Sequence, residues 1–170
     1  IPGVTVVNDF FTEKVATEIR KSAGPVDVIV SSFSFAHIDD MVDVMRGIAA
    51  LLKPDGVFVF EVYYLGIILD ELQYDMMYHE HMSYYSLRSL ELFFERFGME
   101  VFDVERLALR AGTIRYYVRN RGRRRGPVSP RVQELREYEF SRGYHIVETF
   151  SQYAGRVEKS RSDLMGLLSR

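Results

Sequence analysis

Titratable and aromatic side chains concentrate at residues 78–81, which are Tyr78, His79, Glu80 and His81. Histidine titrates at about pH 6.5, so it can accept a proton near neutral pH, and a neighbouring carboxylate can orient it. The segment therefore predicts a general base. Metal binding is the competing interpretation, because both residue types bind metals, but on an extended segment the two histidines would point to one side and Glu80 to the other. A polar surface loop is the third interpretation.

The elements that must position this segment alternate between strand and helix patterns. Three short β-branched and aromatic runs predict strands of a parallel sheet, at residues 4–7, 27–30 and 57–62. The second run is expected to be covered on both faces. Helices are predicted in between, at residues 12–20 and 40–52, with Thr12 and either Asp39 or Asp40 as their N-caps. A tight turn is predicted at residues 53–56, and the order indicates right-handed strand–helix–strand units.

Beyond residue 62 the sequence no longer alternates between single strands and single helices. Two helices and then an antiparallel pair of strands are predicted, at residues 66–73, 86–97, 99–107 and 113–119. The candidate base lies on the polar, aromatic stretch between the two helices. A loop rich in Arg, Gly and Pro and a helical extension complete the chain, which we divide into residues 1–119, 120–130 and 131–170. This ending resembles the α/β sheet of class I methyltransferases, whereas nicotinamide dehydrogenases continue with parallel strands.

Ligands of open α/β sheets bind beyond the carboxyl ends of the strands, which selects three loops of this chain. Phe10 and Phe11 follow the first predicted strand, residues 31–37 follow the second, and Tyr63 follows the third. Phe10 or Phe11 is suited to stack on an adenine ring, with core packing as the alternative for each. His37 is predicted to lie across the same rim as the 78–81 segment.

The segments 51–62, 78–81 with Tyr84, and 100–106 resemble the sugar C-methyltransferases that act on nucleotide-linked ketodeoxysugars. The resemblance covers nearly the whole chain and implies a Rossmann-like class I methyltransferase fold that uses S-adenosyl-L-methionine. It implies that His81 is the base, with Tyr78 and Glu80 as partners and Ala36-His37 as a matching pair. We expect the cofactor to be contacted by Phe10, Phe11, Ser32 and Phe33. We expect the substrate to be contacted by His79, Tyr84 and Arg115. No metal site is expected within this chain.

The chemistry implied by this resemblance requires an enolate, because a carbon attacks a sulfonium methyl group only after losing a proton made acidic by a neighbouring ketone. His81 would remove that proton. Tyr78 or His37 would donate a hydrogen bond to the developing oxyanion, a type of contact worth about 3 kcal/mol. Methyl transfer itself then depends on alignment and on the exclusion of water.

The chain departs from the family pattern at two places. Relatives tend to carry asparagine where this chain has Ser32 or Phe33, and His-Gly-Gly-Ser where it has residues 110–113, which read Arg-Ala-Gly-Thr. The family also has an amino-terminal zinc-binding region, a glycine-rich cofactor loop and a further carboxyl-terminal region. We therefore expect this chain to be a fragment that lacks part of the cofactor site. An exposed sheet edge in such a fragment predicts self-association.

Composition limits the alternatives. The chain has 170 residues, 47% hydrophobic, with a net charge of −2, so it predicts one buried core and no nucleic-acid or membrane partner. The absence of cysteine is compatible with a reducing compartment, and we expect a cytoplasmic enzyme. Two other functions stay open, an O-methyltransferase and a non-catalytic binding module built on five arginines, at positions 119, 121, 123, 124 and 125.

Overall fold

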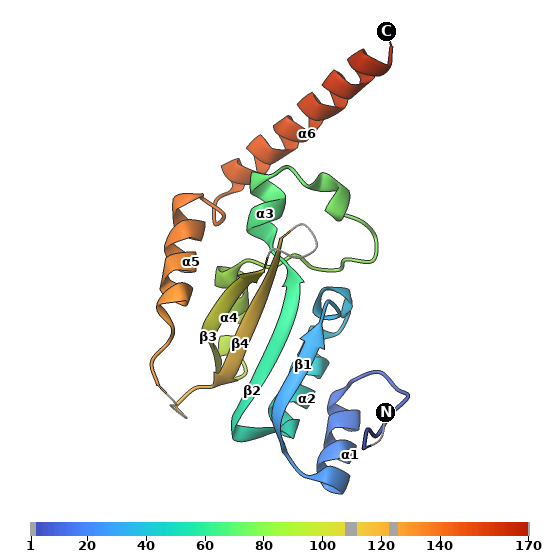
Figure 1. Ribbon diagram of the computed structural model, residues 1–170, viewed down its shortest axis with the longest axis vertical. Helices are drawn as coiled ribbons and strands as arrows, with labels where there is room; N and C mark the ends of the chain where they lie inside the picture. Colours follow the sequence, from blue (N-terminus) through green and yellow to red (C-terminus); the bar gives the residue numbers. More distant parts are fainter. Residues whose placement is uncertain (1–2, 108–111, 123–125, 170) are drawn as a thin grey trace.

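A four-stranded mixed sheet organises the computed structural model, which describes residues 3–107, 112–122 and 126–169 (Figure 1). Its strands lie in the order β1 (Val26–Ser32), β2 (Leu52–Tyr63), β4 (Thr113–Asn120) and β3 (Met99–Leu107). β1 and β2 are parallel, whereas β4 runs antiparallel to both of its neighbours. The predicted α/β fold with an antiparallel ending is therefore confirmed.

Side-chain caps begin several of the helices, and two of these caps, Thr12 and one of the pair Asp39 and Asp40, were predicted. Helix α1 (Glu13–Ala23) starts after Thr12, and α2 (Met41–Leu51) starts after Asp40, whose side chains accept hydrogen bonds from Val15 N and Asp43 N respectively. Helix α4 (Leu87–Glu95) starts after Ser86, whose hydroxyl accepts from Ser89 N. Each cap satisfies a main-chain donor that the helix itself leaves unpaired.

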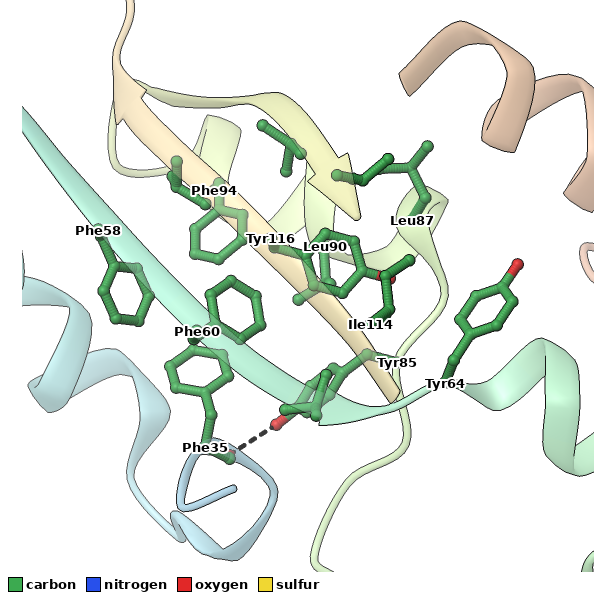
Figure 2. Close-up of a cluster of buried hydrophobic side chains, with 14 of the residues drawn as sticks. Phe35, Phe58, Phe60, Tyr64, Tyr85, Leu87, Leu90, Phe94, Ile114 and Tyr116 are labelled. Atoms are coloured by element: carbon green, nitrogen blue, oxygen red, sulfur yellow. Dashed lines mark hydrogen bonds between the residues drawn. The ribbon is translucent and has the colours of Figure 1, made fainter. Parts of the chain in front are cut away.

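One face of the sheet carries the hydrophobic core. Phe58 and Phe60 of β2 are almost fully buried, and the Phe60 ring lies 4.6 Å from Phe35 and 5.1 Å from Tyr116 of β4. Figure 2 shows these rings in a continuous cluster that also includes Phe94 of α4. Because strand side chains alternate, the opposite face of β2 presents the half-buried residues between them.

Three predictions about the sheet are wrong. Residues 4–7 form no strand and are exposed, because a β-branched run needs a partner strand and none pairs with them in the described chain. β1 is therefore one of the two edge strands, and it is not covered on both faces: Val28 is 54% exposed and Val30 is 67% exposed. The tight turn at residues 53–56 lies within the bounds of β2, where pairing with β1 jumps from Leu52 to Val57.

The remaining elements lie at the carboxyl end of β2 and beside β3. Helix α3 (Leu65–Asp70) is shorter than predicted and leads to the 3₁₀ turn η2 (Tyr74–Met76). Helix α5 (Pro130–Ser141) packs against β3, and α6 (Val147–Leu168) begins close to α3 and projects away from the sheet (Figure 1).

Some predictions fall outside the described residues. Arg110 and Ala111 of the altered turn lie outside them, as do residues 123–125 of the arginine-rich loop. The division into residues 1–119, 120–130 and 131–170 stays a prediction. In the part of the chain that the structure describes, no helix has both the length and the apolar character that crossing a bilayer requires.

Candidate active site

Two loops meet at the carboxyl ends of β1 and β2. The first follows β1 and contains the 3₁₀ turn η1 (Phe35–His37), and the second runs from the end of α3 to Tyr85. Met82 N and Ser83 N both donate to the carbonyl oxygen of Ala36, at 2.9 and 3.3 Å. These main-chain bonds bring residues 33–38 and 78–85 side by side, as the rule for ligand sites in parallel sheets led us to expect.

The first loop is anchored in the core. Phe35 is fully buried among Phe58, Phe60 and Phe94, and its carbonyl oxygen accepts a hydrogen bond of 3.0 Å from the Tyr85 hydroxyl (Figure 2). His37 follows Phe35 by two residues in the same 3₁₀ turn and is exposed. The packing of Phe35 therefore fixes the position of an imidazole that faces solvent.

His37 makes one polar contact that defines its protonation pattern. Its Nδ1 atom lies 2.7 Å from the main-chain carbonyl oxygen of Glu80. Because a carbonyl oxygen can only accept, Nδ1 carries the hydrogen, and the neutral ring keeps its lone pair on Nε2. Glu80, which was predicted as a partner of His81, thus contacts His37 through its main-chain carbonyl oxygen, while its side chain is exposed.

His81 has the same protonation pattern in a buried setting. The residue is only 7% exposed, and its Nδ1 lies 3.0 Å from the carbonyl oxygen of Met76. Nδ1 therefore donates, which leaves the lone pair on Nε2. That Nε2 atom is buried and has no hydrogen-bond partner among the described residues. A buried acceptor without a partner is unfavourable, which marks the atom as a candidate for chemistry.

Four rings surround the imidazole of His81. Ring centroids lie at 4.1 Å for Tyr78, 5.0 Å for His37, 5.1 Å for Tyr63 and 5.7 Å for Tyr84. The Tyr84 hydroxyl donates to the same Met76 carbonyl oxygen that accepts from His81, at 3.0 Å. We call these five residues, His37, Tyr63, Tyr78, His81 and Tyr84, the aromatic cluster.

Tyr78 is the exposed wall of the aromatic cluster. It is 41% exposed, and its ring is the one nearest to His81. Desolvation, followed by the nearby groups of Tyr63 and Glu80, raises the pKa of Tyr78. Its hydroxyl therefore keeps its proton at neutral pH and is available as a hydrogen-bond donor.

The expectation that His79 and His81 point the same way is wrong. His81 N donates to Tyr78 O at 3.0 Å, so residues 78–81 form a turn instead of an extended segment. His79 is consequently exposed whereas His81 is buried. No group of three or more His, Asp or Glu side chains in the described part of the chain is arranged to hold a metal ion.

A cavity of about 630 Å³ adjoins the aromatic cluster on the side of α2. Its lining includes three of the predicted cofactor residues, Phe10, Phe11 and Ser32, together with His37. Phe10 is 87% exposed, so its ring is free to stack on a ligand. This volume lies within the usual range for small-molecule sites. Aromatic faces and hydroxyl groups together fit an adenosine-containing cofactor.

Phe33, the fourth predicted cofactor residue, is not among the residues that line this cavity, and its ring lies 5.5 Å from Tyr63 of the aromatic cluster. Its backbone has a φ of 56°, in the left-handed region that asparagine and glycine adopt more readily than phenylalanine. Its N–H donates to Glu61 O at 3.0 Å. This conformation would suit the asparagine that the family resemblance led us to expect near this position.

Arg115 lies in a row of polar side chains on the half-exposed face of the sheet. Its Nε donates to Glu61 at 2.8 Å and its Nη1 to Glu105 at 3.0 Å. The other oxygen of Glu61 accepts from Ser32 Oγ at 3.0 Å. Two predicted site residues, Ser32 and Arg115, are thus joined through one carboxylate.

Sequence reasoning missed two parts of the site, the Tyr63 ring of the aromatic cluster and the Met76 carbonyl oxygen beside it. Tyr63 was noted only as the start of a loop, although it follows Glu61 by two positions and so shares its face of β2. The carbonyl oxygen of Met76, which accepts from both His81 and Tyr84, leaves no mark in the sequence because any residue could supply it.

Residues 2–104 match the family model described as a methyltransferase domain, and residues 108–170 match one described as a C-methyltransferase C-terminal domain. The chain is 36% identical over 166 residues to the C-methyltransferase NovU of Streptomyces niveus, which covers 98% of this chain and 39% of that protein. The chain thus spans about two fifths of the length of this relative.

Two solved structures illustrate the more distant similarities. A SAM-dependent methyltransferase from Anabaena variabilis is 15% identical, with a TM-score of 0.49 over 69% of this chain and 60% of that one. The mitomycin 7-O-methyltransferase MmcR is 17% identical, with a TM-score of 0.44 over 64% of this chain and 39% of that one.

Proposed function

Because this chain belongs to the methyltransferase-domain family, we propose that it is part of an S-adenosylmethionine-dependent C-methyltransferase. The similarity to a C-methyltransferase along nearly the whole chain supports methylation at carbon. The proposed substrate is a nucleotide-linked deoxysugar, methylated on a carbon next to a ketone. A cytoplasmic location and self-association of the isolated chain stay predictions.

The observation that carries this proposal is the hydrogen bond between His81 Nδ1 and the carbonyl oxygen of Met76. It fixes the hydrogen on Nδ1 and leaves an unshared pair on Nε2, as a base that removes a proton from carbon requires. Nε2 has no competing partner among the described residues, so no hydrogen bond must be broken before the proton is taken.

Tyr78 is the better of the two candidates for donating to the enolate oxygen. The neutral ring of His37 has its hydrogen on Nδ1, committed to Glu80, and so offers no N–H from Nε2. The raised pKa of Tyr78, which comes first from desolvation, keeps its hydroxyl protonated. A donor aimed at a developing oxyanion contributes about 3 kcal/mol to the transition state.

Tyr78 also controls access to the base. Its ring is the one nearest to His81, at 4.1 Å, and Nε2 of His81 is buried, so we propose that the substrate reaches that atom when the Tyr78 side chain moves aside. Since Tyr78 is 41% exposed, this movement breaks few contacts. Closure over the substrate would then exclude water from the enolate.

The cavity beside α2 is the proposed cofactor site. S-adenosylmethionine supplies a methyl group activated by its sulfonium charge. Phe10 and Phe11 would stack on its adenine, and Ser32 would offer its hydroxyl from the cavity wall. Phe33 stays a candidate cofactor contact from beside Tyr63. His37 lines this cavity and also lies against His81, so the two sites adjoin at that residue.

His79, Tyr84 and Arg115 stay candidate substrate contacts. His79 is exposed on the turn beside Tyr78, where it can meet a sugar hydroxyl. Tyr84 offers its ring, since its hydroxyl is bonded to Met76. Arg115 is paired with two carboxylates, which hold its guanidinium in place and reduce its net attraction for a diphosphate.

Exchange of the substrate's α-proton in D₂O tests the proposal. With a nucleotide-linked ketodeoxysugar, the whole enzyme should incorporate deuterium at that carbon, and His81→Ala should slow both exchange and methylation roughly 1,000-fold. His145→Ala is the matched control, because His145 stacks on Phe140 outside the aromatic cluster. Unchanged exchange in His81→Ala would refute the role of the base, and a methyl group found on oxygen would refute methylation at carbon.

A further inference from the structure

The end of helix α3 is held by a residue far along the chain. Arg156 of α6 donates from Nη1 to the carbonyl oxygen of Leu69 and from Nη2 to that of Asp70, both at 3.0 Å. The last carbonyl groups of a helix have no partner within it, so the planar guanidinium satisfies two of them at once. Figure 1 shows the start of α6 close to α3, the placement that this contact requires.

The loop that carries His81 begins at this point. Leu72 has a φ of 58°, a left-handed conformation that is unusual for leucine and turns the chain away from α3. The turn η2 follows, and its last residue, Met76, provides the carbonyl oxygen that accepts from His81 Nδ1 and from Tyr84. The position of that oxygen therefore depends on how the end of α3 is fixed.

A second residue of α6 lies within electrostatic range of the same loop. Tyr153 is half-buried and packs against the hydrophobic core. Burial raises the pKa of Tyr153, Arg156 lowers it, and Asp75, Tyr74 and Tyr84 of the loop raise it further. Helix α6 is thus bonded to the start of the loop through Arg156 and is anchored in the core through Tyr153.

The carboxylate of Asp70 fixes the other side of α3. It accepts hydrogen bonds from Tyr138 and Arg142 and, at 2.7 Å, from Tyr144. With Arg156 on the neighbouring main-chain carbonyl, the last turn of α3 is bonded to both helices of the extension.

We propose that Arg156 is a positioning residue for the base. By holding the end of α3, it places the Met76 carbonyl oxygen where it keeps the hydrogen of His81 on Nδ1. The proposal rests on the proposed function in taking His81 as the base. It predicts that loss of Arg156 lowers kcat more than it raises KM, because the substrate contacts stay in place.

The test compares Arg156→Gln, Arg156→Lys and the control Arg161→Gln in the whole enzyme. Arg161 lies on the same helix and pairs with exposed Glu158 at 3.3 Å, within α6 itself. Arg156→Gln should reduce kcat between roughly 10-fold and 100-fold, the range for a small misplacement of a reacting group. Arg156→Lys keeps the charge but loses the planar pair of N–H donors, so its kcat should lie between those of the wild type and Arg156→Gln. Arg161→Gln should match the wild type.

The tautomer of His81 supplies a second, independent measurement. Imidazole ¹⁵N shifts of the whole enzyme should report hydrogen on Nδ1 in the wild type and in Arg161→Gln, and a mixture of both tautomers in Arg156→Gln. If Arg156→Gln does not fold, the same measurement on Arg156→Lys decides. A single Nδ1–H tautomer with wild-type kcat in the folded variant would overturn the proposal. Failure of the proposed function would appear separately, as unchanged α-proton exchange in His81→Ala.

Discussion

The two histidines of the aromatic cluster make the same hydrogen bond in opposite surroundings. Each donates from Nδ1 to a main-chain carbonyl oxygen, His37 to Glu80 and His81 to Met76. His37 is exposed but follows Phe35, which is fully buried in the core of the sheet. His81 is buried itself, yet the residues around it in sequence, 77–80, are exposed.

This difference shows that hydrophobic packing fixes one loop and polar contacts fix the other. The loop after β1 depends on Phe35 within the ring cluster of Figure 2. The loop after α3 depends on hydrogen bonds at Met76 and on the bonds from α5 and α6 to the end of α3. Substitutions in the two loops should therefore differ in what they change, the core in one case and the alignment of the base in the other.

Phe35→Ala should give the largest effect on stability. Removing a fully buried phenylalanine leaves a cavity among Phe58, Phe60 and Phe94, and such changes cost about 3–5 kcal/mol. Urea unfolding followed by circular dichroism measures the free energy of unfolding. Phe140→Ala is the control, since Phe140 is 68% exposed and should cost under about 0.5 kcal/mol. Equal costs for the two variants would contradict the anchoring of the first loop by the core.

Asp70→Asn should destabilise the other loop by about 2 kcal/mol at pH 7, the scale of hydrogen bonds to a charged group. Burial alone would raise the pKa of the Asp70 carboxyl, but hydrogen bonds from Tyr138, Arg142 and Tyr144 hold it below its usual range. The stabilisation is thus present above the unfolded-state pKa of about 3.9 and is lost as the pH falls through the folded-state value.

The pH dependence separates this effect from a general loss of packing. In urea titrations, the difference between the wild type and Asp70→Asn should shrink as the pH falls below about 4. Asp163→Asn is the control, because Asp163 is exposed and pairs with Lys159 of its own helix, α6. A difference that stays constant from pH 7 to pH 3 would show that the charge of Asp70 is not what holds α3.

Short-range patterns explain how much of the fold the sequence predicted. The N-caps Thr12, Asp40 and Ser86 were each predictable, because a cap bonds to a main-chain N–H only a few residues away. Residues 4–7 failed for the opposite reason, since a strand exists only when another strand pairs with it. Local propensity cannot supply that partner.

The candidate site was also predictable only in part. Its place at the ends of the strands could be predicted, whereas its main-chain contacts could not. The position of His37 across the rim from His81 followed from strand order, and their ring centroids lie 5.0 Å apart. The turn that separates His79 from His81 and the contact of Arg156 with the end of α3 did not follow, because both depend on main-chain carbonyl groups that have no residue signature. The roles assigned to these residues stay predictions.

The smallest expected effects on stability come from two adjacent tyrosines, each of which bonds to a different loop. The Tyr85 hydroxyl donates to the carbonyl oxygen of Phe35, and the Tyr84 hydroxyl to that of Met76, both at 3.0 Å. Tyr84→Phe removes the bond to Met76, and Tyr85→Phe removes the bond to Phe35 together with a weaker one to the Met41 sulfur, so each variant should lower the free energy of unfolding by about 1 kcal/mol. Tyr85 is buried and Tyr84 half-buried, so the cost should be somewhat larger for Tyr85→Phe.

The two variants should separate in catalysis. Tyr85→Phe leaves the Met76 carbonyl untouched, so kcat should stay within about twofold of the wild type. Tyr84→Phe removes the second donor from the oxygen that orients His81, so kcat should fall roughly fivefold, the equivalent of about 1 kcal/mol. Steady-state kinetics with both variants at saturating substrate measures this contrast. An equal loss of kcat in both variants would contradict the separation of the two loops. It would mean that the hydrophobic core positions His81 as well as His37.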